Sequence, residues 1–290
     1  MPRHLPELDG KTFLVCIGAA KCGTSWLHRY LSGLPEVEPS PLKELHFFNA
    51  RTPVPAFGDP DAVALARLRA FMGQPGDTLA NLRGQPAFAA SLDRARMIYD
   101  EDAYFGHFAR LLSPQSRVLA DITPAYATLG PAGFADMRAF FASQQVTLKV
   151  LFIMRDPVDR LWSQLRHVEQ MTPDKPAATH WHLAPDAPAI WSRTDYRATI
   201  AALDACFAPE DRLCLFYETL FAPKTLGRLC GFLGVEAAAD MPAGRQNETR
   251  VQSALPDDAR RTFADLLAPQ YAFCRERFGT EVPEAWGRYS

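Results

Sequence analysis

The sequence predicts an α/β protein built on a P-loop-like, mainly parallel β-sheet with helices on both faces. Four runs are expected to be strands: Thr12–Ile17, Arg117–Ile122, Leu148–Met154 and Arg212–Tyr217. Helical segments separate them, and strands that alternate with helices form parallel sheets covered on both sides. A glycine-bounded turn of the kind that binds phosphate follows the first run. Ligands in such sheets bind at the carboxyl ends of the strands, so we expect the functional site there.

Helices are predicted where apolar residues recur every three or four positions. The first carries Leu27, Tyr30, Leu31 and Leu34, spaced i, i+3, i+4 and i+7. Asp156 followed by Pro157 marks the start of another helix, because an acidic residue caps the end and proline suits the first position. Further helices are expected near residues 104–112 and at about 191–207, 219–233 and 257–277.

The 290 residues fit one domain, 1–290, with two segments that interrupt the strand–helix alternation. Residues 51–100 contain several prolines that we expect to break up short helical pieces, and residues 172–190 read as a long loop. Both are predicted to be insertions at the site, and residues 172–190 with part of 51–100 are expected to form a mobile rim over it, since long irregular connections are often lids or binding loops.

Composition excludes several classes of protein. The formal net charge is -2 and the sequence pI about 6.4, which argues against a general nucleic-acid binder. The N-terminal residues contain neither a signal peptide nor a membrane span by pattern. The six cysteines form no CxxC pair, so a reduced, cytoplasmic protein without a disulfide framework or zinc site is expected. The oligomeric state is left open.

The turn after the first strand, GAAKCGTS, has an unusual lysine position. Gly18 and Gly23 have the spacing of a Walker A loop, but Thr24 stands where that loop has its lysine, and Lys21 lies three residues earlier. The backbone amides and the helix N-terminus still suit a phosphate. The lysine arrangement that spans the β- and γ-phosphates of ATP is missing. The loop therefore suits one phosphate whose leaving group needs no metal, such as a sulfuryl group on a nucleotide 5'-phosphate.

Two segments resemble the donor site of sulfotransferases that use PAPS (3'-phosphoadenosine 5'-phosphosulfate). CIGAAKCGTSWLHRYL resembles their 5'-phosphosulfate loop, which implies that the donor is bound by Ala20, Lys21, Cys22, Gly23, Thr24 and Ser25. MRDPVDRLWSQL resembles their 3'-phosphate motif, with Arg155 at a strand end and Ser163 eight residues later. A guanidinium gives forked, charge-assisted donors to a phosphate. The alternative for Arg155 is a surface ion pair with Asp156 or Asp159.

Other segments resemble the heparan sulfate sulfotransferase branch. KELHFFN is similar to its KExHFF segment, which implies Glu44 as catalytic base with Lys43 and His46 beside it. We expect Glu44 and His46, two residues apart, to share a strand face. DITPAYA resembles the branch's (E/D)KTPAY stretch, which places Tyr126, with Lys43, near the acceptor. QNETR resembles a late segment near the nucleotide, which implies that Arg250 closes over it. Ile122 and Asn49 replace the branch's lysine and aspartate, which argues against a heparan-like acceptor.

The resemblance implies a cytoplasmic sulfotransferase of bacterial type. Glu44 would deprotonate a hydroxyl or amine of a small-molecule, saccharide or lipid acceptor. Lys21 would stabilise charge on the departing phosphate, and no metal is expected. Two alternatives remain: a metal-dependent P-loop kinase acting on a small molecule, and a non-catalytic nucleotide-binding protein of the same fold. The kinase would need ATP and magnesium, and the binding protein would be favoured if Glu44 pointed away from the pocket.

Overall fold

A computed structural model of the chain describes residues 1–237 and 251–289 and contains a five-stranded parallel sheet. The strand order is β2-β3-β1-β4-β5, and each neighbouring pair is parallel. The strands are β1 (Thr12–Gly18), β2 (Val37–Pro39), β3 (Val118–Ile122), β4 (Thr147–Met154) and β5 (Arg212–Phe216). The predicted parallel sheet is confirmed. Only β2, three residues long, was not foreseen, because a strand so short has no periodicity to detect.

Register brings the carboxyl ends of the central strands to one edge. Cys16 of β1 pairs with Ile122 of β3, and Gly18 pairs with Phe152 of β4. The chain leaves β1 toward β2 and β3 on one side, and later adds β4 and β5 on the other. Connections therefore diverge at the end of β1, which is the place where open α/β sheets bind ligands.

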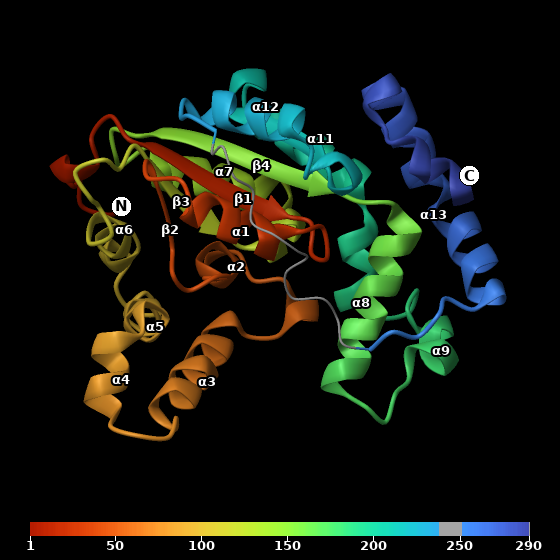
Figure 1. The fold of residues 1–290 in the computed structure, drawn as a ribbon, viewed down its shortest axis with the longest axis horizontal. Helices are drawn as coiled ribbons and strands as arrows, with labels where there is room; N and C mark the ends of the chain where they lie inside the picture. Colours follow the sequence, from red (N-terminus) through yellow and green to blue (C-terminus); the bar gives the residue numbers. More distant parts are fainter. Residues whose placement is uncertain (238–250, 290) are drawn as a thin grey trace.

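Helices lie on both faces of the sheet (Figure 1). In this view α11 and α12 lie above it and α1 below, while α8 and α13 pack together at its right-hand end. The longer helices around the sheet are α1 (Thr24–Ser32), α6 (Asp102–Ala109), α7 (Gly130–Phe141), α8 (Pro157–Met171), α11 (Tyr196–Cys206), α12 (Pro223–Leu233) and α13 (Asp257–Phe278). No helix in the described part of the chain is both long and apolar enough to cross a membrane.

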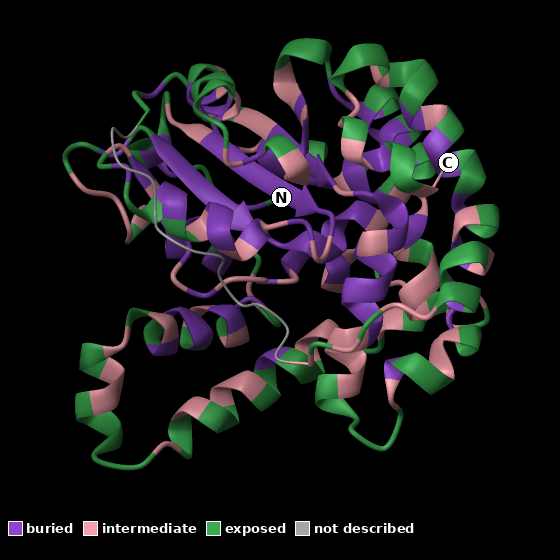
Figure 2. Ribbon diagram, turned by 45° about the vertical axis from the view of Figure 1, so that its right-hand side comes forward, coloured by how far each residue is buried: buried purple, intermediate pink, exposed green. Residues whose placement is uncertain are grey.

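Residues 51–100 are more helical than predicted. They hold α3 (Pro60–Met72), α4 (Thr78–Gly84) and α5 (Pro86–Arg96), after α2 (Phe47–Arg51). Pro60 and Pro86 occupy the first turns of α3 and α5, where proline is tolerated, so they start helices instead of breaking them. This arm of helices extends away from the sheet, and its outer surfaces are exposed (Figure 2).

The long loop predicted at residues 172–190 also contains short helices. These are α9 (Ala177–His180) and α10 (Pro188–Trp191), with a 3-10 turn, Trp181–Leu183, between them. Each is too short to leave a helical period in the sequence. A second 3-10 turn, η5 (Ser192–Thr194), then leads into α11. The helix expected at about 191–207 therefore begins as η5 and becomes regular only at Tyr196.

An aromatic cluster fixes α2 against the sheet. Phe13 of β1 packs edge-on to Phe108 of α6, with ring centroids 4.6 Å apart. Phe47 stacks on Tyr104 at 4.6 Å, and Phe48 meets Tyr126 at 5.5 Å. Phe47 and Phe48 are nearly fully buried. These two rings anchor the short segment before them, residues 43–46, at the carboxyl edge of the sheet.

Candidate functional site

The loop between β1 and α1 forms one wall of a cavity at the carboxyl edge of the sheet. Only glycine fits at two of its positions. A Cβ on Gly18, whose φ is +144°, would lie 2.8 Å from the carbonyl oxygen of Pro124, and one on Gly23, at φ +80°, would lie 3.0 Å from the ring of Tyr217. α1 begins at Thr24, so its first turn presents N–H groups without helical partners. Such a turn, with the positive end of the helix dipole, suits an anion.

Lys21 lies in this loop and lines the cavity. Burial lowers the pKa of its ammonium group, and the nearby charges of Lys43 and Arg155 lower it further, whereas Glu44 opposes the shift. The loop is held to the end of β4, because Nη1 of Arg155 donates to the carbonyl oxygen of Lys21 at 3.4 Å. An anion placed among these cations would relieve their mutual repulsion.

Arg155 and Ser163 lie where β4 passes into α8. Arg155 follows the last residue of β4, and its guanidinium lies over the ring of Tyr217, 4.8 Å from the centroid. The hydroxyl of Tyr196 donates to the Arg155 carbonyl oxygen at 2.8 Å. Ser163 is two turns into α8, 6% exposed, and lines the same cavity as Arg155 and Lys21.

Asp156 caps α8, as the sequence predicted. Its carboxylate accepts from the backbone N–H of Asp159 at 3.0 Å and from the hydroxyl of Tyr271 at 2.8 Å. Asp159 in turn accepts from the hydroxyl of Tyr289 at 3.1 Å. Within the described residues neither carboxylate is within ion-pair distance of Arg155, so the ion-pair alternative for this arginine is not favoured. Its guanidinium faces the cavity.

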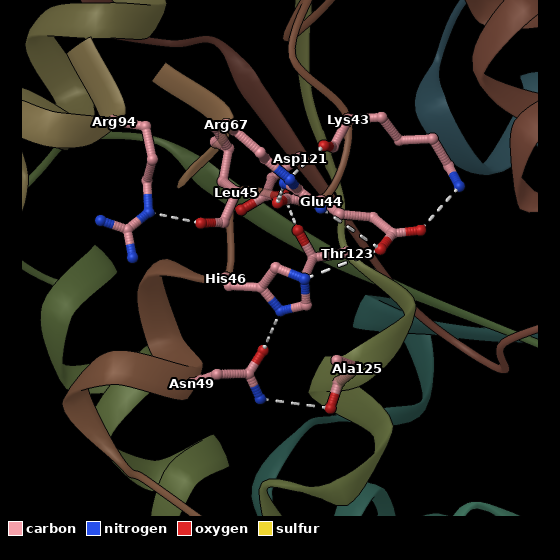
Figure 3. Close-up of polar contacts among 10 residues, drawn as sticks. All are labelled: Lys43, Glu44, Leu45, His46, Asn49, Arg67, Arg94, Asp121, Thr123 and Ala125. Atoms are coloured by element: carbon pink, nitrogen blue, oxygen red, sulfur yellow. Dashed lines mark hydrogen bonds and ion pairs between the residues drawn. The ribbon is translucent and has the colours of Figure 1, made fainter. Parts of the chain in front are cut away.

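Residues 43–46 form the side of the cavity that carries its carboxylate. The expectation that Glu44 and His46 share the face of a strand is wrong. Glu44 and His46 both have left-handed backbone angles, with φ of 62° and 56°, and they precede α2 instead of lying on a strand. The N–H of Glu44 donates to the carbonyl oxygen of Ile122 at 3.0 Å, which ties the segment to the end of β3. The two side chains still meet, with Nε2 of His46 3.6 Å from Oε2 of Glu44 (Figure 3).

Positive groups surround the Glu44 carboxylate. Nζ of Lys43 lies 3.1 Å from Oε1, and Nη2 of Arg67 lies 3.9 Å from Oε2. Burial alone would raise the pKa of Glu44, but the hydrogen bond from His46 and the charge of Lys43 outweigh it and hold the pKa well below its usual range. The carboxylate is therefore ionised at neutral pH.

Asn49 orients the His46 ring. Its Nδ1 lies 3.0 Å from Oδ1 of Asn49, whose Nδ2 donates to the carbonyl oxygen of Ala125 at 3.3 Å. Because that contact places the Asn49 amide nitrogen toward Ala125, Oδ1 is the acceptor for His46 Nδ1–H. Nε2 then faces Glu44, as Figure 3 shows. Asn49 thus orients His46 from a buried position and does not line the cavity.

Two arginines from the helical arm hold the backbone of this segment. Nη1 of Arg67, on α3, donates to the carbonyl oxygen of Glu44 at 2.6 Å. Nε of Arg94, on α5, donates to that of Leu45, and its Nη2 donates to Asp61 at 2.7 Å. Arg94 is only 2% exposed. Figure 3 shows the two side chains reaching the segment from the same side.

The cavity has a volume of about 690 Å³, within the range of small-molecule sites. It brings together ten of the residues singled out in the sequence: Ala20, Lys21, Gly23, Thr24, Ser25, Lys43, Glu44, His46, Arg155 and Ser163. Its described lining holds six lysines or arginines but a single carboxylate, that of Glu44. These cations are Lys21, Lys43, Arg67, Arg155, Arg166 and Arg193.

Three of the residues singled out in the sequence are not placed in the cavity. Cys22 is fully buried beneath the loop, and its N–H donates to the carbonyl oxygen of Ala19 at 3.3 Å. Tyr126 is also fully buried, and its hydroxyl donates to Asp121 at 3.0 Å. Neither residue lines the cavity. Arg250 lies outside the described residues.

Sequence reasoning missed several residues that line the cavity. Arg166, His167 and Gln170 lie three, four and seven positions after Ser163, so they share its face of α8, and this spacing could have revealed them. Burial lowers the pKa of His167, and the charge of Lys21 adds to the shift. Arg67 comes from the segment 51–100, read as an insertion, and Arg193 lies just after the segment 172–190; no motif pointed to either residue.

Comparisons with known proteins converge on one family. The model described as "Sulfotransferase family" matches residues 14–240. A crystal structure of a sulfotransferase from Alicyclobacillus acidocaldarius superposes with a TM-score of 0.63 at 24% identity, covering 96% of this chain and 99% of that one. A sulfotransferase domain from the curacin biosynthetic pathway superposes with a TM-score of 0.50 at 17% identity, covering 90% and 98%. At these identities the two structures show a common fold. No curated protein sequence matches the chain.

Proposed function

Because the chain belongs to the sulfotransferase family, we propose that it transfers a sulfuryl group from PAPS to a hydroxyl or amine of a small acceptor. The observation that carries the proposal is the meeting of Lys21, Arg155, Ser163 and Glu44 around one cavity. These residues come from three segments far apart in the sequence. A loop for one phosphate, an arginine and serine for a second, and a carboxylate suit a nucleotide with two separate phosphates and a nearby acceptor.

The donor would be bound by its two phosphate groups. The 5'-phosphosulfate is proposed to lie against Gly23, Thr24 and Ser25 at the start of α1, with Lys21 beside it. The 3'-phosphate is proposed to bind the guanidinium of Arg155 and the hydroxyl of Ser163. AMP has no 3'-phosphate and would leave Arg155 unpaired, and an unmade bond to a charged group is costly. This difference gives a physical basis for selecting PAPS.

In the proposed reaction the acceptor oxygen attacks sulfur in line with the bond to the 5'-phosphate. A new O–S bond forms while the S–O bond to the phosphate breaks, and the acceptor proton passes to Glu44. Negative charge grows on the departing phosphate, where Lys21 and the loop N–H groups stabilise it. The product nucleotide is adenosine 3',5'-bisphosphate.

The low pKa of Glu44 bears on this role. An ionised carboxylate is ready to accept a proton, but one held by Lys43 and His46 is a weak base. We propose that the sulfuryl group, once bound, draws the Lys43 ammonium toward its oxygens. Losing that contact would raise the basicity of Glu44 when an acceptor is in place. Lys43 would then serve the sulfuryl group and not only the acceptor.

The placement of Glu44 on the cavity wall supports an enzyme over a nucleotide-binding protein that has lost activity. The family match likewise disfavours the kinase alternative. The experiment is a screen with PAPS labelled in its sulfuryl group, in the presence of a chelator, across phenols, sugars, amines and lipid head groups. We expect labelled product with at least one class, and its loss in Lys21→Met. Phosphate transfer from ATP that requires magnesium, with no sulfuryl transfer, would establish the kinase instead.

A further inference from the structure

Arg193 carries a positive charge that no described residue neutralises. It lies in η5, just after the segment 172–190, and lines the cavity. Within residues 1–237 and 251–289 no carboxylate lies within ion-pair distance of its guanidinium, and its Nε is buried without a hydrogen-bond partner. The neighbouring Asp195 caps α11, accepting from the N–H of Ala198 at 2.9 Å and from Gln270 at 3.2 Å. That carboxylate is therefore engaged elsewhere.

An aromatic ring from the segment 51–100 holds this guanidinium in place. Cζ of Arg193 lies over Phe57, 4.6 Å from the ring centroid, so a cation–π contact fixes the arginine while leaving its N–H groups available. Phe57 belongs to η2 (Pro55–Phe57), against which α10 packs. The segments 51–100 and 172–190 thus meet where η2 contacts α10, and Arg193 contacts Phe57 beside this point.

The other cations of the cavity contact, or are proposed to bind, a different group. Lys21 and Arg155 are proposed to bind the donor phosphates, and Nη1 of Arg166 donates to the carbonyl oxygen of Val251 at 3.4 Å. Lys43 and Arg67 contact the Glu44 carboxylate. Arg193 is the lysine or arginine of the described cavity lining to which no such group is assigned. Burial lowers the pKa of Arg193, and the charge of Arg160 lowers it further. The charge of Glu44 opposes the shift, so Arg193 and the Glu44 carboxylate interact electrostatically.

We infer that Arg193 binds an oxyanionic group on the acceptor, and that the acceptor is therefore a small hydroxyl compound carrying a carboxylate or a phosphate. This inference rests on the proposed function. An arginine presents a planar fork of donors that matches such groups in two hydrogen bonds. Burying it without a partner is costly, and an anionic ligand removes that cost on binding. The acceptor would be held by its charge at Arg193 while its hydroxyl is presented to Glu44.

The test uses three pairs of hydroxyl compounds that share a skeleton and differ in charge. They are 4-hydroxyphenylacetate and 4-hydroxyphenylacetamide, glucuronate and glucuronamide, and glycerol 3-phosphate and glycerol. Binding to the protein saturated with adenosine 3',5'-bisphosphate is measured by calorimetry, and transfer from labelled PAPS is measured in parallel. The first two pairs probe a carboxylate and the third a phosphate. We expect the charged member of at least one pair to bind about ten-fold more tightly, or to react about ten-fold faster at low concentration.

Three variants assign that preference to a residue. Arg193→Gln should abolish it, while Arg193→Lys should keep part of it, because lysine retains the charge but not the fork. Arg197→Gln is the matched control: Arg197 is exposed on α11, four residues further on, and outside the cavity. All three should bind adenosine 3',5'-bisphosphate as the unsubstituted protein does.

Several outcomes would overturn the inference. They are the absence of a charge preference in all three pairs, a preference that survives in Arg193→Gln, and a loss of nucleotide affinity in Arg193→Gln, which would assign Arg193 to the donor. The proposed function fails differently. If the charged compounds bind through Arg193 but no sulfuryl group is transferred to any acceptor, the anion site stands and the reaction does not. If the nucleotide itself does not bind, the proposed donor site is wrong.

Discussion

Glu44 combines two properties that its neighbours impose. Its carboxylate is kept ionised by Lys43 and His46, and its backbone is held in a left-handed conformation that an L residue with a side chain adopts only at a cost. Strain of this kind persists where surrounding contacts enforce it and is common at functional sites. Here the contacts are the hydrogen bonds from Glu44 N–H to Ile122 and from Arg67 to the Glu44 carbonyl oxygen.

We predict that Glu44→Gln lowers turnover by about 10²–10⁴-fold while nucleotide affinity stays the same. Glutamine keeps the shape of the side chain but cannot take the proton. Turnover must be measured with an acceptor hydroxyl of high pKa, since an acceptor already ionised needs no base. Glu7→Gln, an exposed substitution outside the cavity, serves as control. Near-normal turnover in Glu44→Gln would place the base elsewhere, with His46 as the first candidate to replace.

Asp156 shows the opposite electrostatic situation, because it is 2% exposed and no described lysine, arginine or histidine lies within ion-pair distance of its carboxyl group. Burial raises its pKa to about 7, in spite of the bonds from Asp159 N–H and Tyr271. An aspartate in the unfolded chain has a pKa of about 3.9. Between these two values the native state holds a proton that the unfolded state has lost. The contribution of Asp156 to the free energy of unfolding should therefore fall as the pH rises from about 4 to about 7.

We predict that Asp156→Asn flattens this part of the pH dependence, because asparagine caps α8 equally well without a titrating group. Urea unfolding at several pH values between 4 and 8 measures the slope for both proteins. Asp257→Asn, an exposed acid in the first turn of α13, is the control and should keep the slope of the unsubstituted protein. Equal slopes in Asp156→Asn and the unsubstituted protein would show that this carboxyl titrates normally.

At the scale of elements, the arm formed by α3, α4 and α5 reaches back to the site. Arg67 of α3 and Arg94 of α5 bind the carbonyl oxygens of Glu44 and Leu45. The arm is therefore attached to the segment that presents the proposed base. Removing one of these bonds should let that segment move, and displacement of a catalytic group by about 1 Å can cost about 10²-fold in rate.

We predict that Arg94→Met lowers kcat at least ten-fold while leaving nucleotide affinity and acceptor KM within about two-fold. Arg94→Lys should recover part of the rate, because it can still donate one hydrogen bond. Arg96→Met, on the same helix but exposed and paired with Asp100, is the matched control. Assays are run at a temperature where thermal unfolding shows each variant to be folded. A folded Arg94→Met with unchanged kcat would mean that Arg94 serves stability alone.

The elements that the sequence predicted well are those with a strong local signal. β1, β4 and the start of α8 have long buried runs or a cap followed by proline, and they lie within a residue or two of their expected positions. The arm was read as irregular because its prolines were taken as breaks, whereas Pro60 and Pro86 start helices. α3 also lacks a clear apolar stripe, with only Ala64 buried, so periodicity gives little evidence for it.

At the scale of the whole molecule, the site is a local exception to the overall charge. The chain has a formal net charge of -2, yet the described lining of the cavity holds six cations and one carboxylate. Motifs pointed to the residues proposed to bind the donor, because the residues of each motif are close together in the sequence. Arg193 and Arg67 could not be found in this way, since only the folded chain brings their segments to the cavity. Cys22 and Tyr126 were expected at the site because they belong to these motifs, but their side chains are buried beside the cavity.

We propose above that the cavity recognises a nucleotide with phosphates at both the 3' and 5' positions. Calorimetry with adenosine 3',5'-bisphosphate and with AMP, both in the presence of a chelator, tests it most directly. We predict that the bisphosphate binds at least about 30-fold more tightly than AMP, which corresponds to about 2 kcal/mol. Arg155→Ala should remove this difference by weakening the bisphosphate alone. Equal affinity of the unsubstituted protein for the two nucleotides would show that Arg155 and Ser163 do not bind a 3'-phosphate.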